Sequence, residues 1–120
     1  MNRIEIGVAD PKIEQARLLE WAARIDAGET PPEATPALNF SSEKQLQATF
    51  TEKRLELLRF VARNEGLSIR QIAQGLDRDY KNVHGDISLL AELGLLEKRD
   101  GGLFAPYDDI VVRYVLREAA

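Results

Sequence analysis

The side chains best suited to bind another molecule lie between positions 80 and 88, in the sequence YKNVHGDIS. At 3.6 residues per turn of a helix, Val83 and Ile87 share one face with Leu90. The polar side chains flank or oppose that face: Tyr80, Lys81, Asn82, His84 and Ser88. Ammonium, amide, imidazole and hydroxyl groups form hydrogen bonds with base edges and phosphates. We therefore predict that this face contacts nucleic acid.

Two short helices joined by a turn are expected to position this face. Ser68 is placed to cap the first helix, and Gln71 lies three residues later, as a capping box requires. Apolar residues at helical spacing follow: Ile69, Ile72, Ala73 and Leu76. We expect the chain to turn over 75–79 and Asp79 to cap the second helix. Gly94 suits the end of that helix, where a positive φ is common.

A β-hairpin is predicted directly after Gly94, because two short alternating runs flank Asp100-Gly101-Gly102. Upstream, Thr49 and Glu52 suggest the start of a support helix, which Asn64-Glu65-Gly66 ends. Its expected buried stripe is Leu55, Leu58, Val61 and Ala62, broadened by Leu57 and Phe60. The segment 67–69 is expected to pair with the hairpin. Three helices followed by a hairpin predict a winged helix-turn-helix.

The N-terminal segment predicts a strand and a helix. Residues 3–8 alternate polar and apolar side chains. Asp10 and Pro11 suit the start of a helix that continues to Gly28. Trp21 is expected to be a core or packing residue rather than a ligand contact. Alternatively, three side chains of this helix form a contact surface for a partner: Leu18, Trp21 and Ile25.

The next segment, 29–39, contains three of the five prolines and is expected to be an extended linker. Ser42 and Gln45 then predict a helix to about Phe50. Near the C-terminus, residues 110–116 are rich in β-branched and aromatic side chains and predict a strand, with a helix as the alternative. A bare strand edge promotes aggregation, so this strand should pair with the N-terminal strand or with the same strand of a second subunit.

Length and composition favour one soluble domain, and the order of the predicted helices and hairpin gives it α+β class, mainly α with a small β-wing. The chain has 120 residues, 44% of them hydrophobic, and a net charge of −4. The charge is uneven: residues 1–50 hold five Lys/Arg against eight Asp/Glu, whereas residues 51–107 hold nine of each. We expect a winged helix-turn-helix over 41–107, preceded by a strand-helix extension at 1–40 and followed by a strand and tail at 108–120.

The sequence gives no indication of catalysis or of a cofactor. There is no cysteine, and His84 is the single histidine. It lies on a polar helix face without metal-ligand spacing, so a structural or DNA contact is the favoured interpretation. We expect no enzyme, no cofactor and no metal. The chain lacks a run of eighteen apolar residues and a signal-peptide pattern, so a cytoplasmic protein without membrane contact is expected.

From Ile69 to Leu96 the spacing resembles MarR- and ArsR-like winged helices. More narrowly, RLELLRFVARNEGLSIRQIAQGLDRDYKNVHGDISLLAELGLLEKRDGG with the following FAPYDDI resembles a small prokaryotic family of transcriptional regulators. IEIGV, the Trp21 helix and LNFSS also fit that family, and the DYKNVH-D stretch is the most specific part. Members are often encoded beside a toxin and described as antitoxins, so the resemblance implies a toxin partner and autoregulation.

One position departs from the resemblance. The family pattern has an arginine after the histidine, and this chain has Gly85. An arginine there could contact a guanine or a phosphate, and a lost bidentate contact removes about 1–3 kcal/mol of base discrimination. Glycine inside a helix also costs about 1 kcal/mol relative to alanine.

We expect a sequence-specific DNA-binding regulator that binds double-stranded DNA as a homodimeric autorepressor, with an antitoxin role implied by the resemblance. The alternative is an antitoxin module that covers a toxin with its acidic N-terminal arm and binds little DNA. Major-groove contacts are assigned to residues 81, 82, 84 and 88, backbone contacts to 70, 71, 78 and 80, and phosphate or minor-groove contacts to the hairpin. The predicted DNA-binding residues are Arg70, Gln71, Arg78, Tyr80, Lys81, Asn82, His84, Ser88, Lys98, Arg99, Gly101 and Gly102.

Overall fold

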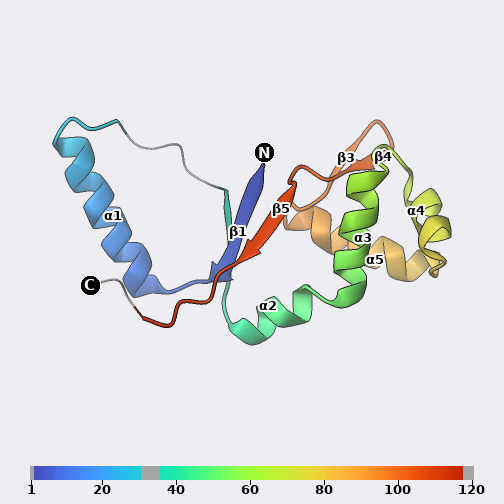
Figure 1. Ribbon diagram of the computed structural model, residues 1–120, viewed down its shortest axis with the longest axis horizontal. Helices are drawn as coiled ribbons and strands as arrows, with labels where there is room; N and C mark the ends of the chain where they lie inside the picture. Colours follow the sequence, from blue (N-terminus) through green and yellow to red (C-terminus); the bar gives the residue numbers. More distant parts are fainter. Residues whose placement is uncertain (1, 31–35, 118–120) are drawn as a thin grey trace.

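Helices and short strands form an α+β fold in the computed structural model, which describes residues 2–30 and 36–117 (Figure 1). The helices are α1 (Pro11–Asp26), α2 (Glu43–Thr49), α3 (Glu52–Arg63), α4 (Ile69–Leu76) and α5 (Tyr80–Glu92). The strands are β1 (Arg3–Val8), β2 (Ala37–Phe40), β3 (Glu97–Arg99), β4 (Gly102–Phe104) and β5 (Asp109–Val112). The molecule is elongated, with principal extents of 54 × 30 × 19 Å.

Three strands from distant parts of the sequence form one parallel sheet, in the order β2-β1-β5. The N-terminal strand is confirmed, and it is one of the two partners predicted for the C-terminal strand. That strand is shorter than expected: it ends at Val112, and residues 113–117 are neither strand nor helix. Part of the predicted linker is also strand. Residues 37–39 pair with β1, and Phe40, the last residue of β2, is buried in the core.

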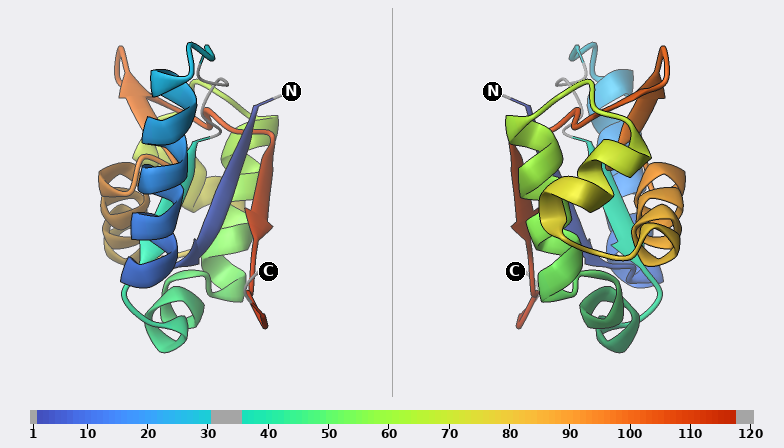
Figure 2. Two further views of the ribbon diagram at one scale, coloured as in Figure 1. Left: turned by 90° about the vertical axis from the view of Figure 1, so that its left-hand side faces the viewer. Right: turned by 90° about the vertical axis from the view of Figure 1, so that its right-hand side faces the viewer.

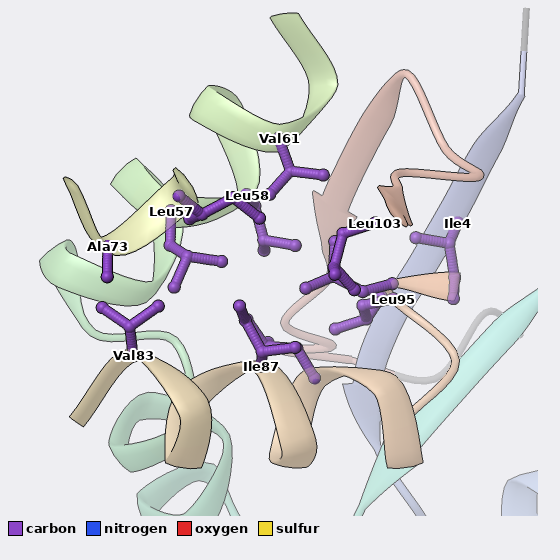
Figure 3. Close-up of a cluster of buried hydrophobic side chains, with 12 residues drawn as sticks. Ile4, Leu57, Leu58, Val61, Ala73, Val83, Ile87, Leu95 and Leu103 are labelled. Carbon is purple, nitrogen blue, oxygen red and sulfur yellow. The ribbon is translucent and has the colours of Figure 1, made fainter. Parts of the chain in front are cut away.

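The core joins the sheet to the three helices α3, α4 and α5. Figure 3 shows side chains from α3 and α5 meeting those of the hairpin and of β1. The predicted seam of α5 is confirmed, since Val83, Ile87 and Leu90 are all buried. Ile4 of β1 belongs to the same cluster, so the N-terminal strand packs on the helices that follow it by some fifty residues in sequence.

Local capping explains most of the helix boundaries. The Ser68–Gln71 capping box is present, and Asp79 and Ser42 cap α5 and α2 as expected. The predicted cap at Thr49 is wrong. The hydroxyl of Thr49 donates to the Gln45 carbonyl inside α2, and Thr51 caps α3 by accepting a hydrogen bond from the amide of Arg54.

Two further sequence expectations need correction. Ala62 was expected in the buried stripe of α3 but is exposed, because Leu57, Leu58 and Val61 already define the face that meets the core. Gly75 does not end the helix, because it lies inside α4. The turn begins at Asp77, which has a left-handed backbone conformation with a φ of 52°.

Helix α1 lies apart from α3, α4 and α5, on the other side of the sheet (at the left in Figure 1 and in front in the left-hand view of Figure 2). One link to the sheet is a hydrogen bond of 3.4 Å between the Asn39 amide and the Glu14 carboxylate. Among the described residues, no helix combines the length and the apolar character that crossing a membrane requires.

Candidate functional site

The outward face of α5 is open to solvent. Lys81, Asn82, His84 and Ser88 are all exposed, whereas the opposite face of the same helix is fully packed. The prediction that one face of this helix is buried and the other exposed is therefore confirmed. We refer to the four exposed polar residues as the polar ridge of α5. A short turn joins the end of α4 to the first turn of α5. The Tyr80 ring in that first turn also lies near Arg70 at the start of α4.

An aromatic ring links the two helices at that end. Tyr80 is 47% exposed, and its ring centroid lies 5.9 Å from the guanidinium of Arg70 on α4. The His84 ring lies one turn further along α5, 5.9 Å from the Tyr80 ring. Arg70 and Gln71 are both exposed, although the side chain of Gln71 is already engaged in the capping box. The structure thus brings a guanidinium, a phenol and an imidazole together on one exposed surface.

Arg78 does not belong to this surface. Its Nη2 donates to Asp86 Oδ2 at 2.7 Å, and its side chain is only 16% exposed. Its Nη1 is buried and has no hydrogen-bond partner among the described residues. Arg78 was expected to contact a phosphate, but the turn between α4 and α5 directs its side chain inward to a carboxylate of α5.

The second partner of Asp86 is Arg54 on α3, whose Nε donates to Oδ1 at 3.0 Å. Arg54 also donates to the backbone carbonyls of Ala48 and Thr49 at the end of α2. One carboxylate therefore ties α5 to α3 and to the turn after α4. We refer to Arg54, Arg78 and Asp86 as the arginine clamp.

The arginine clamp sets the protonation of its carboxylate. Burial alone would raise the pKa of Asp86, but hydrogen bonds from Arg78 and Arg54, together with their positive charges, hold that pKa below its ordinary value of 3.8. Sequence reasoning missed Arg54 and Asp86. The available signal was an acidic residue at 86 adjoining the apolar seam, three residues after Val83 and four before Leu90.

The hairpin β3-β4 is anchored to the loop before α4. The amide of Gly66 donates to the Leu103 carbonyl, and the amide of Leu103 donates to the Leu67 carbonyl, both at 2.9 Å. The predicted pairing of segment 67–69 with the hairpin is therefore confirmed at Leu67. In the right-hand view of Figure 2 the hairpin extends along the same side of the molecule as α5.

The tip of the hairpin is Asp100-Gly101, with φ values of 51° and 81°. Lys98 and Arg99 are exposed just before it, and the Arg99 guanidinium lies 4.1 Å from the centroid of the Phe104 ring. Gly102 was predicted as part of the contact surface, but it is buried in β4 against Gly66. Its role is to let two backbones approach closely.

Gly85 has no such packing role, because a Cβ built at this position meets nothing within 4 Å. We expect Gly85→Ala to raise the free energy of unfolding by about 1 kcal/mol, since alanine is the better helix former. Urea unfolding followed by circular dichroism measures the change. The same substitution at Gly75 in α4 is the matched comparison, since its Cβ would overlap the Phe60 ring. A destabilised Gly85→Ala variant would contradict the expectation.

The apolar stripe of α1 is largely solvent-exposed. Leu18, Trp21 and Ile25 are 70%, 40% and 48% exposed. The core interpretation of Trp21 is wrong, because its side chain is 40% exposed and belongs to neither buried cluster of the described residues. The three side chains follow Glu14 along one helical face, which leaves them available to a partner. A groove of about 490 Å³ lies between the start of α1, the end of β1 and residues 113–117, and carboxylates and guanidiniums both line it.

A family model described as HVO_A0114 matches residues 49–112, which is more than half of the chain. The match runs from the end of α2 to the end of β5 and therefore includes the arginine clamp, α5 and the hairpin. Neither the curated proteins nor the solved structures contain a match to this chain.

Proposed function

We propose that this chain, which belongs to the HVO_A0114 family, is a sequence-specific DNA-binding transcriptional regulator of the winged helix-turn-helix type. The observation that supports this most is the exposed polar ridge of α5. Recognition in the major groove requires a helix that is fixed to the rest of the protein and presents polar side chains outward. The outward face of α5 presents Lys81, Asn82, His84 and Ser88. The resemblance to MarR- and ArsR-like regulators remains part of this proposal.

The rigid support of α5 favours readout of base sequence. The arginine clamp fixes α5 to α3 from the side opposite the ridge, and the capping box fixes the start of α4 beside it. Arg70 and Tyr80 then hold a cation and a phenol next to the first turn of α5, where phosphates flank a major groove. Lys98 and Arg99 of the hairpin add two cations on the same side of the molecule.

A two-fold homodimer is part of the proposal, because one recognition helix reads few base pairs and a pair of them reads two half-sites at fixed spacing. Such a dimer fits an autorepressor that binds upstream of its own gene. Catalysis, a cofactor and a metal have no part in this mechanism.

Titration of the DNA upstream of the gene with the protein, at two salt concentrations, tests the proposal. We expect the affinity to fall as salt rises, because Lys and Arg release counterions from phosphates. Lys81→Glu should weaken binding by about tenfold or more, which corresponds to about 1.4 kcal/mol. Lys44→Glu makes the same charge change on the exposed side of α2 and is the control. Absent binding, a flat salt dependence or equal effects of both variants would contradict the proposal.

A second candidate function is an antitoxin module that neutralises a toxin through protein contacts. The exposed stripe of Leu18, Trp21 and Ile25 favours it, together with the acidic excess in residues 1–50. Trp21 is the single tryptophan, so its fluorescence would report burial by a partner directly. The two functions are compatible, since they use different surfaces. Protein that fails to bind DNA but neutralises the product of the neighbouring gene would favour the second alone.

A further inference from the structure

The parallel sheet has β2 at one edge and β5 at the other, and among the described strands β5 pairs with β1 alone. The left-hand view of Figure 2 shows this strand at the margin of the sheet. An open edge presents unpaired amides and carbonyls, and proteins protect such edges with proline, lysine or a bulge. β5 has the sequence DIVV, which contains no proline or lysine and has Asp109 as its one charged residue.

The direction of each backbone group on β5 follows from its bonds to β1. The amides of Asp109 and Arg113 donate to the carbonyls of Asn2 and Ile6. Because backbone groups alternate along a strand, the amides and carbonyls of Ile110 and Val112 point to the outer edge. These two residues are therefore the ones that a further strand would pair with.

We propose that the edge of β5 pairs antiparallel with β5 of a second copy of this chain, about a two-fold axis at Val111. In this register Ile110 forms a hydrogen-bonded pair with Val112 of the other copy, and Val112 with Ile110. The outward-pointing backbone groups of Ile110 and Val112 then form hydrogen bonds on each chain. The two three-stranded sheets become one continuous sheet of six strands.

The side chains are self-complementary in this register. Asp109 lies opposite Arg113 of the other copy, and the relation occurs twice because of the symmetry. Val111 lies opposite its own equivalent. Opposite charges and β-branched pairs across antiparallel strands are both stabilising. Shifting the register by two residues in either direction places Asp109 or Arg113 opposite Val111 and loses both ion pairs.

The exposed apolar surface around the edge is also consistent with pairing to a second copy of this chain. Val111 and Val112 are each 39% exposed, and Tyr114, Val115 and Leu116 continue the exposed apolar run directly after the strand. Pairing with a second copy would bring the Val111 side chains of the two chains together. The pairing supplies an interface for the homodimer of the proposed function and rests on that part of it. It makes no use of the exposed residues of α5, so loss of this interface and loss of DNA contacts are measured separately.

Sedimentation analysis of charge variants tests the ion pairs. We expect the full chain to be a dimer, and Arg113→Asp to weaken dimerisation by about tenfold or more, because two attractions become two repulsions. The double variant Asp109→Arg/Arg113→Asp should restore the dimer. It also turns the exposed Arg3–Asp109 ion pair of 4.0 Å within the chain into a pair of like charges, a change that solvent screens and that affects stability little. Arg117→Asp, four residues further along, should have no effect.

Cysteine cross-linking tests the register in the otherwise wild-type chain, which contains no cysteine. Val111 would form a non-hydrogen-bonded pair with its equivalent, at a Cα separation of about 4.5 Å, and a disulfide can span that distance. Val111→Cys should therefore give a covalent dimer on mild oxidation, whereas Val115→Cys, outside the strand, should not. A monomeric wild type overturns the proposal. So does a dimer in which Val111→Cys stays unlinked, or one in which the double charge variant fails to recover.

Discussion

Replacing Asp86 with alanine is expected to lower the free energy of unfolding by about 3 kcal/mol, because it leaves two largely buried guanidiniums without their shared carboxylate. Arg54 would keep its contacts with the carbonyls of Ala48 and Thr49. Arg78 would keep no side-chain hydrogen bond among the described residues, since its Nη1 already lacks a partner. The damage should therefore fall on the turn between α4 and α5.

Chemical unfolding of the variant measures this loss, with Glu92→Ala as the control. Glu92 lies on the same helix, is exposed and forms no ion pair within the described residues. Its replacement should change stability by no more than about 0.5 kcal/mol. Equal effects at the two positions would show that the arginine clamp does not hold the fold together.

The same carboxylate should make stability depend on pH in the acid range. The pKa of Asp86 is lower in the folded chain than its ordinary value of 3.8. Its stabilising contribution is therefore complete above that value and disappears as the pH falls through the folded pKa. Asp86→Asn keeps an acceptor oxygen but does not titrate, so its stability should fall less steeply below about pH 4. Parallel acid-unfolding curves for the two proteins would contradict this.

Replacing Gly102 with alanine is expected to destabilise the hairpin by about 1–3 kcal/mol, as overpacking of a filled site does. A Cβ at position 102 would lie 2.5 Å from the carbonyl oxygen of Gly66 and 2.9 Å from its Cα. The loop cannot withdraw easily, because hydrogen bonds from Gly66 and to Leu67 fix it against Leu103 on the adjacent β4 backbone.

Thermal unfolding measures the effect of Gly102→Ala, and Gly85→Ala is the control, because it adds the same methyl group where nothing lies within 4 Å. Under the proposed function, Gly102→Ala should also weaken DNA binding, since it displaces Lys98 and Arg99 together with the hairpin. Lys98→Ala would weaken binding without loss of stability. A Gly102→Ala variant as stable as the wild type would mean that the contact with Gly66 can relax.

The sequence by itself determined the features that depend on neighbouring residues. Ser68 and Gln71 form their capping box because both lie within one helical turn. The spacing of Val83, Ile87 and Leu90 predicted the buried side of α5, and hence the exposed ridge, because side-chain direction repeats with the helical period. Gly94 has the positive φ that its place after α5 suggested.

Only the tertiary structure decided how distant segments meet. The guanidinium of Arg78 could contact a phosphate, but it donates to Asp86, eight residues later in the sequence. Asp86 also accepts from Arg54, 32 residues before it, which completes the arginine clamp. Gly102 belongs to the tip in sequence and to the core in space, because Gly66 lies against it. The partner of β5 is likewise a strand about a hundred residues earlier in the chain. Helical periodicity and capping follow from local backbone geometry, whereas burial and strand pairing follow from which surfaces the folded chain brings together.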